Sequence, residues 1–201
     1  MKTLFKILLA LAIITNIWMM MVGKNFIDAN GQHFSIMKLE LPESKEAMQS
    51  MITGFSSTTT QAVLKQLNID YIFMAGCYPA ILVLCLIATR RVSEINSMEK
   101  DLKLIESGKA WKKLLTILAL LQILAWGLDV WENAQIEKWI WSNSVESDIQ
   151  FLKIRVYIKF AIGIAGFLTA ALLLLFSNGT LKKLSEQKVK AIPVNGNVQM
   201  I

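Results

Sequence analysis

Four long runs of apolar residues divide the chain, separated by segments in which polar and charged residues dominate. The runs cover residues 4–22, 69–89, 114–132 and 156–176. Each approaches or reaches the ~20 residues that a helix needs to cross the hydrocarbon core of a membrane. Together with their connections they fill most of the 201 residues. The pattern therefore predicts one domain, residues 1–176, folded as an all-α, antiparallel four-helix transmembrane bundle.

The segment 23–68, between the first two runs, is long enough to hold structure of its own. Asn30-Gly31 is a typical type I′ turn pair, so a small hairpin is expected around it. Pro42 stands where a helix can begin, and apolar residues recur at helical spacing from there. We predict one amphipathic external helix over Pro42–Leu67, weakened by Gly54 and the polar run Ser56–Thr60. Its apolar face could lie on the outer membrane surface, but a Met-rich apolar face without a basic polar face favours capping of the bundle.

Basic residues are concentrated in the short segment 90–113, between the second and third runs. It holds seven of the 21 lysines and arginines, so the positive-inside rule places it in the cytoplasm. An even number of spans then puts both termini in the cytoplasm. Within this segment, Ser93–Ser107 has a helical stripe that would end at Gly108. The basic tail 177–201 is expected to be disordered.

The composition favours a membrane protein over a nucleic-acid-binding one. Hydrophobic residues make up 54% of the chain and the mean hydropathy is +0.47. The net charge of +6 comes from basic residues beside the apolar runs, so their expected partner is the lipid bilayer. The first run continues through Trp18 to Val22 without a small-x-small cleavage pattern, so we interpret it as an uncleaved span. Cys77 and Cys85, eight residues apart on one helix, are too distant for a disulfide and are expected to pack.

The most informative polar residues lie at the far end of the third run. Asp129, Glu132 and Asn133 are spaced i, i+3 and i+4, so on a helix they share one face. Trp126 and Gln122 extend that face by one and two turns. An ionisable residue inside a membrane span is costly and usually faces the bundle interior, where it has a partner. The stretch therefore predicts one wall of a buried polar cluster.

The predicted orientation brings groups from two other spans to the same depth. The second span begins at Asp70, and the fourth carries Lys159 about one turn below its outer end, with Arg155 before it. All of these groups fall in the outer third of the membrane, so we predict a single polar layer. Its candidate binding residues are Asp70, Tyr71, Tyr78, Gln122, Trp126, Asp129, Glu132, Asn133 and Lys159.

Two interpretations of this layer stay open. In the first, Asp129 or Glu132 pairs with Lys159 or Arg155, Asp70 bonds to a tyrosine or tryptophan, and the layer only fixes how the helices fit together. In the second, the groups line a cavity that is open to the outside and roofed by the external helix. Such a cavity could bind a lipid headgroup, a small molecule or a proton.

The function classes follow from these interpretations. The leading expectation is a non-enzymatic membrane protein whose polar layer binds a lipid, a small molecule or a partner, or only stabilises the bundle. One alternative is a small membrane enzyme acting on a lipid-like substrate, with Asp129 and Glu132 as acid and base and Lys159 as electrostatic stabiliser. Another is a proton- or ion-coupled carrier subunit, which would need to form a homo-oligomer. No cofactor is expected, and no metal site, because His33 is the only histidine and has no Cys or Glu at ligand spacing.

Three short motifs follow one another along the chain. They are Ile36-Met-Lys-Leu-Glu40-Leu-Pro42, Asp70-Tyr-Ile-Phe-Met, and Leu128-Asp129-Val-Trp-Glu132-Asn133, of which the Asp-x-x-Glu-Asn piece is the specific one. In this order they resemble a family of four-span bacterial inner-membrane proteins to which no activity is assigned. The resemblance covers residues 1–176, and it implies the four-span architecture and a location in a bacterial inner membrane. It singles out Asp70, Asp129, Glu132 and Asn133, and it implies no activity.

Overall fold

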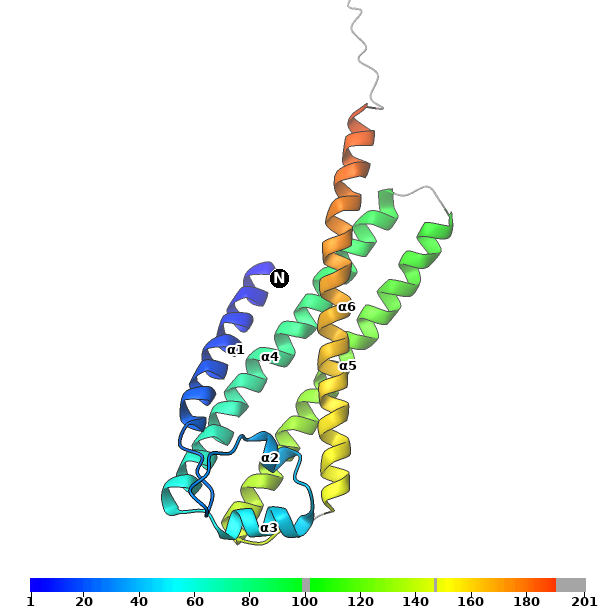
Figure 1. The fold of residues 1–201 in the computed structure, drawn as a ribbon. Helices are drawn as coiled ribbons and strands as arrows, with labels where there is room; N and C mark the ends of the chain where they lie inside the picture. The colour runs from blue at the N-terminus through cyan, green and yellow to red at the C-terminus, as the bar shows by residue number, and fades with distance from the viewer. Residues whose placement is uncertain (99–101, 147, 191–201) are drawn as a thin grey trace, which may run out of the picture.

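Four long helices run alongside one another in the computed structural model, which describes residues 1–98, 102–146 and 148–190 (Figure 1). They are α1 (Lys2–Gly23), α4 (Ser57–Met98), α5 (Leu102–Ser142) and α6 (Ile149–Lys190), while the short α2 (Met37–Glu40) and α3 (Lys45–Thr53) lie together at one end. All four long helices are long and apolar enough to cross a membrane. The predicted all-α four-helix bundle is confirmed, and the chain is an integral membrane protein.

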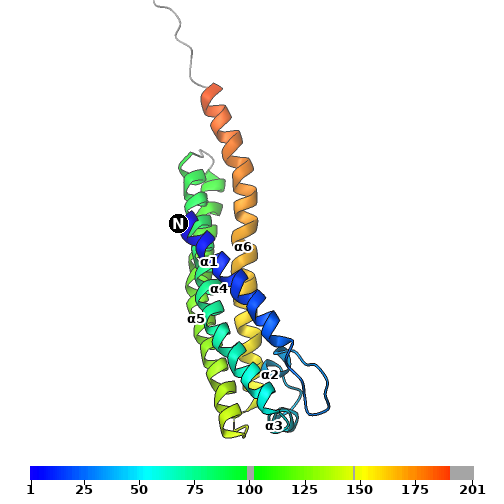
Figure 2. The same cartoon turned by 90° about the vertical axis from the view of Figure 1, so that its left-hand side faces the viewer.

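The bundle is built around α4. This helix packs against α1, α5 and α6, and α5 packs against α6. Within the described residues α1 has no comparable contact with α5 or α6, so it lies on one side of a three-helix core (Figure 2). The approach of α1 to α4 is close at Gly76, where a Cβ would stand 3.0 Å from the backbone nitrogen of Ala12. The absence of a side chain at Gly76 therefore lets the two helices meet.

Residues 24–56, which we call the cap, cover the end of the bundle that carries α2 and α3. The rings of Phe26 and Phe34 stack with centroids 5.3 Å apart, and Phe34 stacks on Phe55 at 5.5 Å. These rings belong to a buried apolar cluster that also includes Trp139 of α5. The predicted hairpin is reduced to one isolated bridge, between Ile27 and His33.

The single external helix predicted over Pro42–Leu67 is wrong. The structure has α3 ending at Thr53 and α4 starting after Ser56, and α4 then continues into the second span. Ser56 Oγ accepts a hydrogen bond of 3.1 Å from the backbone N–H of Thr59, which is the contact of a residue that caps a new helix. The polar run at Ser56 therefore starts α4 and does not interrupt a longer helix.

The separate surface helix predicted over Ser93–Ser107 is also wrong. Within the described residues, α4 continues to Met98, and α5 runs from Leu102 through Gly108. A Cβ at Gly108 would come within 2.0 Å of Asn96 Oδ1 on α4. The absence of a side chain at Gly108 therefore lets α4 come close, and α5 does not end at this glycine.

The C-terminal helix is longer than the predicted span. It continues to Lys190, past Ser177, where a disordered tail was expected to begin. Residues 181–190 are mostly Leu, Lys, Gln and Glu, which are strong helix formers, and this explains the difference. Residues 191–201 of the expected tail lie outside the described residues.

Side-chain hydrogen bonds fix the cap on the bundle. Gln49 of α3 donates from Nε2 to the carbonyl of Asn143 (2.9 Å) and accepts at Oε1 from the N–H of Val145 (2.7 Å), both in the α5–α6 connection. Lys153 of α6 donates to the carbonyl of Glu43 at 3.1 Å. These contacts define the path of the cap, and with it the position of α2, whose last residue reaches into the bundle.

Candidate functional site

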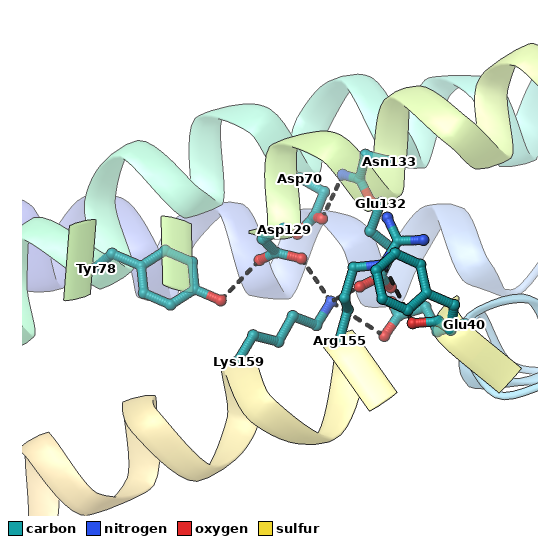
Figure 3. A network of polar contacts seen from close by, with 9 residues as sticks. Glu40, Asp70, Tyr78, Asp129, Glu132, Asn133, Arg155 and Lys159 are labelled. Atoms are coloured by element: carbon teal, nitrogen blue, oxygen red, sulfur yellow. Dashed lines mark hydrogen bonds and ion pairs between the residues drawn. The ribbon is translucent and has the colours of Figure 1, made fainter. Parts of the chain in front are cut away.

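One ammonium group stands among carboxylates from two other helices (Figure 3). Lys159 of α6 is 3% exposed, and its Nζ lies 2.5 Å from Asp129 Oδ1 and 2.8 Å from Glu132 Oε2, both on α5. The same nitrogen lies 3.6 Å from Oε2 of Glu40, the last residue of α2. A single cation therefore joins α2, α5 and α6, and the pairing expected of Asp129 or Glu132 with Lys159 is present for both.

Two hydrogen bonds connect α4 to the same region. The Tyr78 hydroxyl donates to Asp129 Oδ2 at 2.9 Å, so each oxygen of that carboxylate has a donor. Asn133 Nδ2 donates to Asp70 Oδ2 at 2.6 Å, so the donor found for Asp70 is an amide and not the expected tyrosine or tryptophan. Six of the predicted residues thus come together, and with Glu40 they form what we call the polar network: Glu40, Asp70, Tyr78, Asp129, Glu132, Asn133 and Lys159 (Figure 3).

Three other predicted residues lie outside the polar network. Gln122 has no exposed surface, and it donates to the carbonyls of Leu118 and Ile162 at 3.2 Å each. It therefore fixes α5 against α6. Trp126 is 37% exposed on the surface of the bundle. Tyr71 is half-buried against a small apolar cluster beside the network.

Arg155 lies one turn before Lys159 but is held differently. Its guanidinium carbon is 3.5 Å from the ring centroid of Trp131 and 4.2 Å from that of Phe151, and its Nε donates to the carbonyl of Phe151 at 3.1 Å. Stacking on aromatic rings stabilises a cation without neutralising a carboxylate. Among the described residues the ion-pairing partner is therefore Lys159 and not Arg155.

Glu40 is the member of the polar network that the sequence reasoning missed. It was noted only within a motif of the resemblance, because a carboxylate in a connecting segment is normally exposed to water. In the structure Glu40 is 8% exposed, and its burial raises the pKa of the carboxyl above the ordinary 4.5 even though the Lys159 ammonium lowers it. The burial of Glu40 could have been predicted from its position between Leu39 and Leu41, because an acidic residue flanked by apolar ones can be buried with them.

Carboxylates outnumber cations in this region. Desolvating an ion pair costs about as much as the attraction returns, so such a pair specifies how elements fit more than it adds stability. The network therefore supports the interpretation that it fixes helix packing, and it also leaves acidic oxygens in excess. The acidic side chains are Glu40, Asp70, Asp129 and Glu132, and the cationic ones are Lys159 and the stacked Arg155.

A cavity of about 1030 Å³, which we call the groove, adjoins the polar network where α1 stands apart from α6. Its charged end lies toward the cap and is lined by Glu40, Gln66, Asp70, Asp129 and Lys159. Its other end is apolar and reaches Phe5 of α1, Leu84 of α4 and Leu168 of α6. The groove therefore runs along the bundle from charged to apolar walls.

The positions of the acidic groups decide what chemistry they could do. Asp129 lines the groove, but both of its oxygens are engaged, by Tyr78 and Lys159. Glu132 has no exposed surface and is not a lining residue, so the carboxylates expected to act as acid and base do not both face the groove. No group of three or more His, Cys, Asp or Glu in the described part of the chain is arranged to hold a metal ion.

Comparisons with known proteins do not assign a function to the groove. The basis for a proposal is therefore the geometry of the groove and the polar network. No protein-family model matches the chain, and no curated protein or solved structure matches it either.

Proposed function

We propose that the protein binds an amphiphilic molecule from the membrane, with its apolar chain in the groove and its polar head at the polar network. The observation that carries this proposal is the change from charged to apolar walls along one cavity. The α1 wall from Phe5 to Met20 is about 22 Å long at 1.5 Å per residue. This exceeds half of the ~30 Å hydrocarbon core, so one acyl chain fits along it.

The charged end of the groove belongs to the outer leaflet in this proposal. The adjoining ends of α4 and α5, with basic residues such as Arg90 and Lys113, lie at the opposite end of the bundle from the cap (Figure 1). Short basic connections stay in the cytoplasm, so the cap faces outward. A bacterial inner membrane is the proposed location, and the ligand comes from its outer half.

Two other functions compete with this one. If the polar network only locks the helices together, the groove holds bulk lipid without selection. An enzyme acting on a lipid-like substrate is disfavoured, because Glu132 is enclosed away from the groove that would hold the substrate. Ligand binding uses the groove and the network together, and therefore explains both features.

The proposal can be tested by filling the groove with a side chain. Gly163 of α6 lines the groove, and a Cβ there meets no atom within 4 Å, so Gly163→Leu adds a side chain where the wall of the groove is open. Gly127 of α5 also has no atom within 4 Å of a Cβ, and it is not a lining residue. Gly127→Leu is therefore the matched control, since both substitutions replace glycine within a helix.

The measurement is mass spectrometry of the lipids and metabolites extracted from the wild type and both purified variants. We expect one amphiphile to be enriched over the bulk membrane lipids in the wild type and in Gly127→Leu, and to be lost from Gly163→Leu. All three proteins should melt at similar temperatures. Identical lipid profiles in the three samples would show that the groove selects nothing, and the locking role would be the function of the network.

A further inference from the structure

The charged end of the groove contains two buried oxygens that accept no hydrogen bond from the described residues. Gln66 and Glu40 line the groove and are 7% and 8% exposed. Among the described residues Gln66 Oε1 has no hydrogen-bond partner, and Glu40 Oε2 has none either, its nearest cation being the Lys159 ammonium at 3.6 Å. Asp70 lies one turn after Gln66 on α4 and lines the same end, with Oδ2 bonded to Asn133. Buried acceptors are normally satisfied, so these oxygens indicate the place of a hydrogen-bond donor.

The negative charge of the carboxylates at this end of the groove is also not fully balanced by cations. Lys159 is already shared by three carboxylates, and Arg155 is stacked on aromatic rings and is not a lining residue. An anionic head would meet Glu40, Asp70 and Asp129, whereas a cationic head would offset them. Burial raises the pKa of Glu40 although the Lys159 ammonium lowers it, and a further cation beside Glu40 would favour its charged form.

The chemical class of the ligand's head group follows from the need for both hydrogen-bond donors and positive charge. A metal ion fits poorly, because the described residues include no suitable group of ligands. A hydroxyl head could donate hydrogen bonds but would leave the acidic charge unbalanced. An ammonium group with N–H bonds supplies both donors and charge, and it is the smallest head that does so.

We propose that the groove selects a phospholipid whose head ends in a primary amine, a proposal that rests on the amphiphile-binding function above. The ammonium group donates to Gln66 Oε1 and Glu40, and its charge lies near Glu40 and Asp70. Lys24, an exposed lining residue at the cap end of α1, is available for the phosphate. One acyl chain follows the groove, and the second lies in the bilayer through the open side between α1 and α6.

The test compares three phospholipids with identical acyl chains. Phosphatidylethanolamine has a primary ammonium group, phosphatidylcholine has the same charge but no N–H donor, and phosphatidylglycerol has hydroxyls and no cation. Native mass spectrometry of the detergent-solubilised protein measures how much of each is retained at equal mole fraction. We expect the ethanolamine lipid to be preferred by about tenfold, which corresponds to 1.4 kcal/mol.

Substitutions at the charged end show whether these acceptors cause the preference. Glu40→Gln and Gln66→Leu should each reduce it, and Gln66→Leu serves if Glu40→Gln does not fold. Glu43→Gln neutralises an exposed cap carboxylate outside the groove and should leave the preference unchanged. A preference that persists in both groove variants overturns the assignment.

The outcomes separate this inference from the function on which it rests. If all three lipids are retained equally and Gly163→Leu releases all of them, the groove binds lipid but the amine specificity is overturned. If Gly163→Leu releases none of them, the proposed function fails and the headgroup inference fails with it.

Discussion

Replacing Lys159 by methionine tests the polar network most directly, because methionine keeps an unbranched side chain and removes the charge. Asp129, Glu132 and Glu40 then lose their shared cation. Removing one partner of a buried ion pair costs about 3–5 kcal/mol, because the other charge stays buried without compensation. We therefore expect Lys159→Met to lower the free energy of unfolding by at least about 3 kcal/mol, measured by denaturant titration in a mild detergent.

A double variant separates charge from packing. The double variant Lys159→Met with Glu132→Gln also removes one of the carboxylates that have lost their cation. Its decrease in the free energy of unfolding should therefore be smaller than the sum of the decreases in the two single variants. The control is Lys138→Met, because Lys138 pairs with Glu146 at 2.9 Å with side chains 60% and 55% exposed, and an exposed pair contributes little. Wild-type stability of Lys159→Met, or strict additivity in the double variant, would refute the reasoning.

Three further perturbations address the helix contact, the cap and the buried acid. Gly76→Leu should push α1 away from α4, because even a Cβ at Gly76 stands 3.0 Å from the α1 backbone; paired spin labels on the two helices measure the change in distance. Gln49→Ala removes two hydrogen bonds to the α5–α6 connection and should lower the free energy of unfolding by about 1–3 kcal/mol, measured by denaturant titration. Burial raises the pKa of Glu40 above 4.5, so the native state holds this proton more tightly than the unfolded state does. The resulting stability is present below pH 4.5 and is lost as the pH rises from 4.5 through the raised pKa; melting temperatures across this range should show a smaller loss in Glu40→Gln than in the wild type.

The spanning helices could be predicted because the length of an apolar run relates directly to the thickness of a membrane. The helix ends could not, because hydropathy does not report where a helix stops after it leaves the hydrocarbon. With 42 residues, α4 is about 63 Å long, about twice the ~30 Å core. At the break before α4 the cap also comes close, since a Cβ at Gly54 would stand 2.9 Å from the Cβ of Ala29, and this approach is not visible in the local sequence.

The centre of the polar network could be predicted because an isolated charge inside a membrane is too costly. Lys159 and Asp129 were therefore expected as partners once the orientation gave them the same depth. Glu40 could not be found in this way, because its position depends on the path of the cap, which contacts such as that between Gln49 and Val145 define. The spacing of Trp126 placed it on the same helix face as Asp129. A helix face is more than 100° wide, so spacing alone does not show where the buried part of the face ends and the lipid-facing part begins.

The one-sided packing of α1 has a consequence for how the molecule opens. The other three long helices hold one another, whereas α1 is attached along a single face and at its cap end, where Val22 joins the buried cluster. Elements with contacts on one side detach at a lower free energy than the whole structure unfolds. Because the cap retains the C-terminal end of α1, detachment begins at its N-terminal end and widens the groove from the apolar side. For the amphiphile-binding function proposed above, detachment of α1 and entry of an acyl chain would be the same motion, and a substitution that tightens the α1–α4 contact would slow ligand exchange.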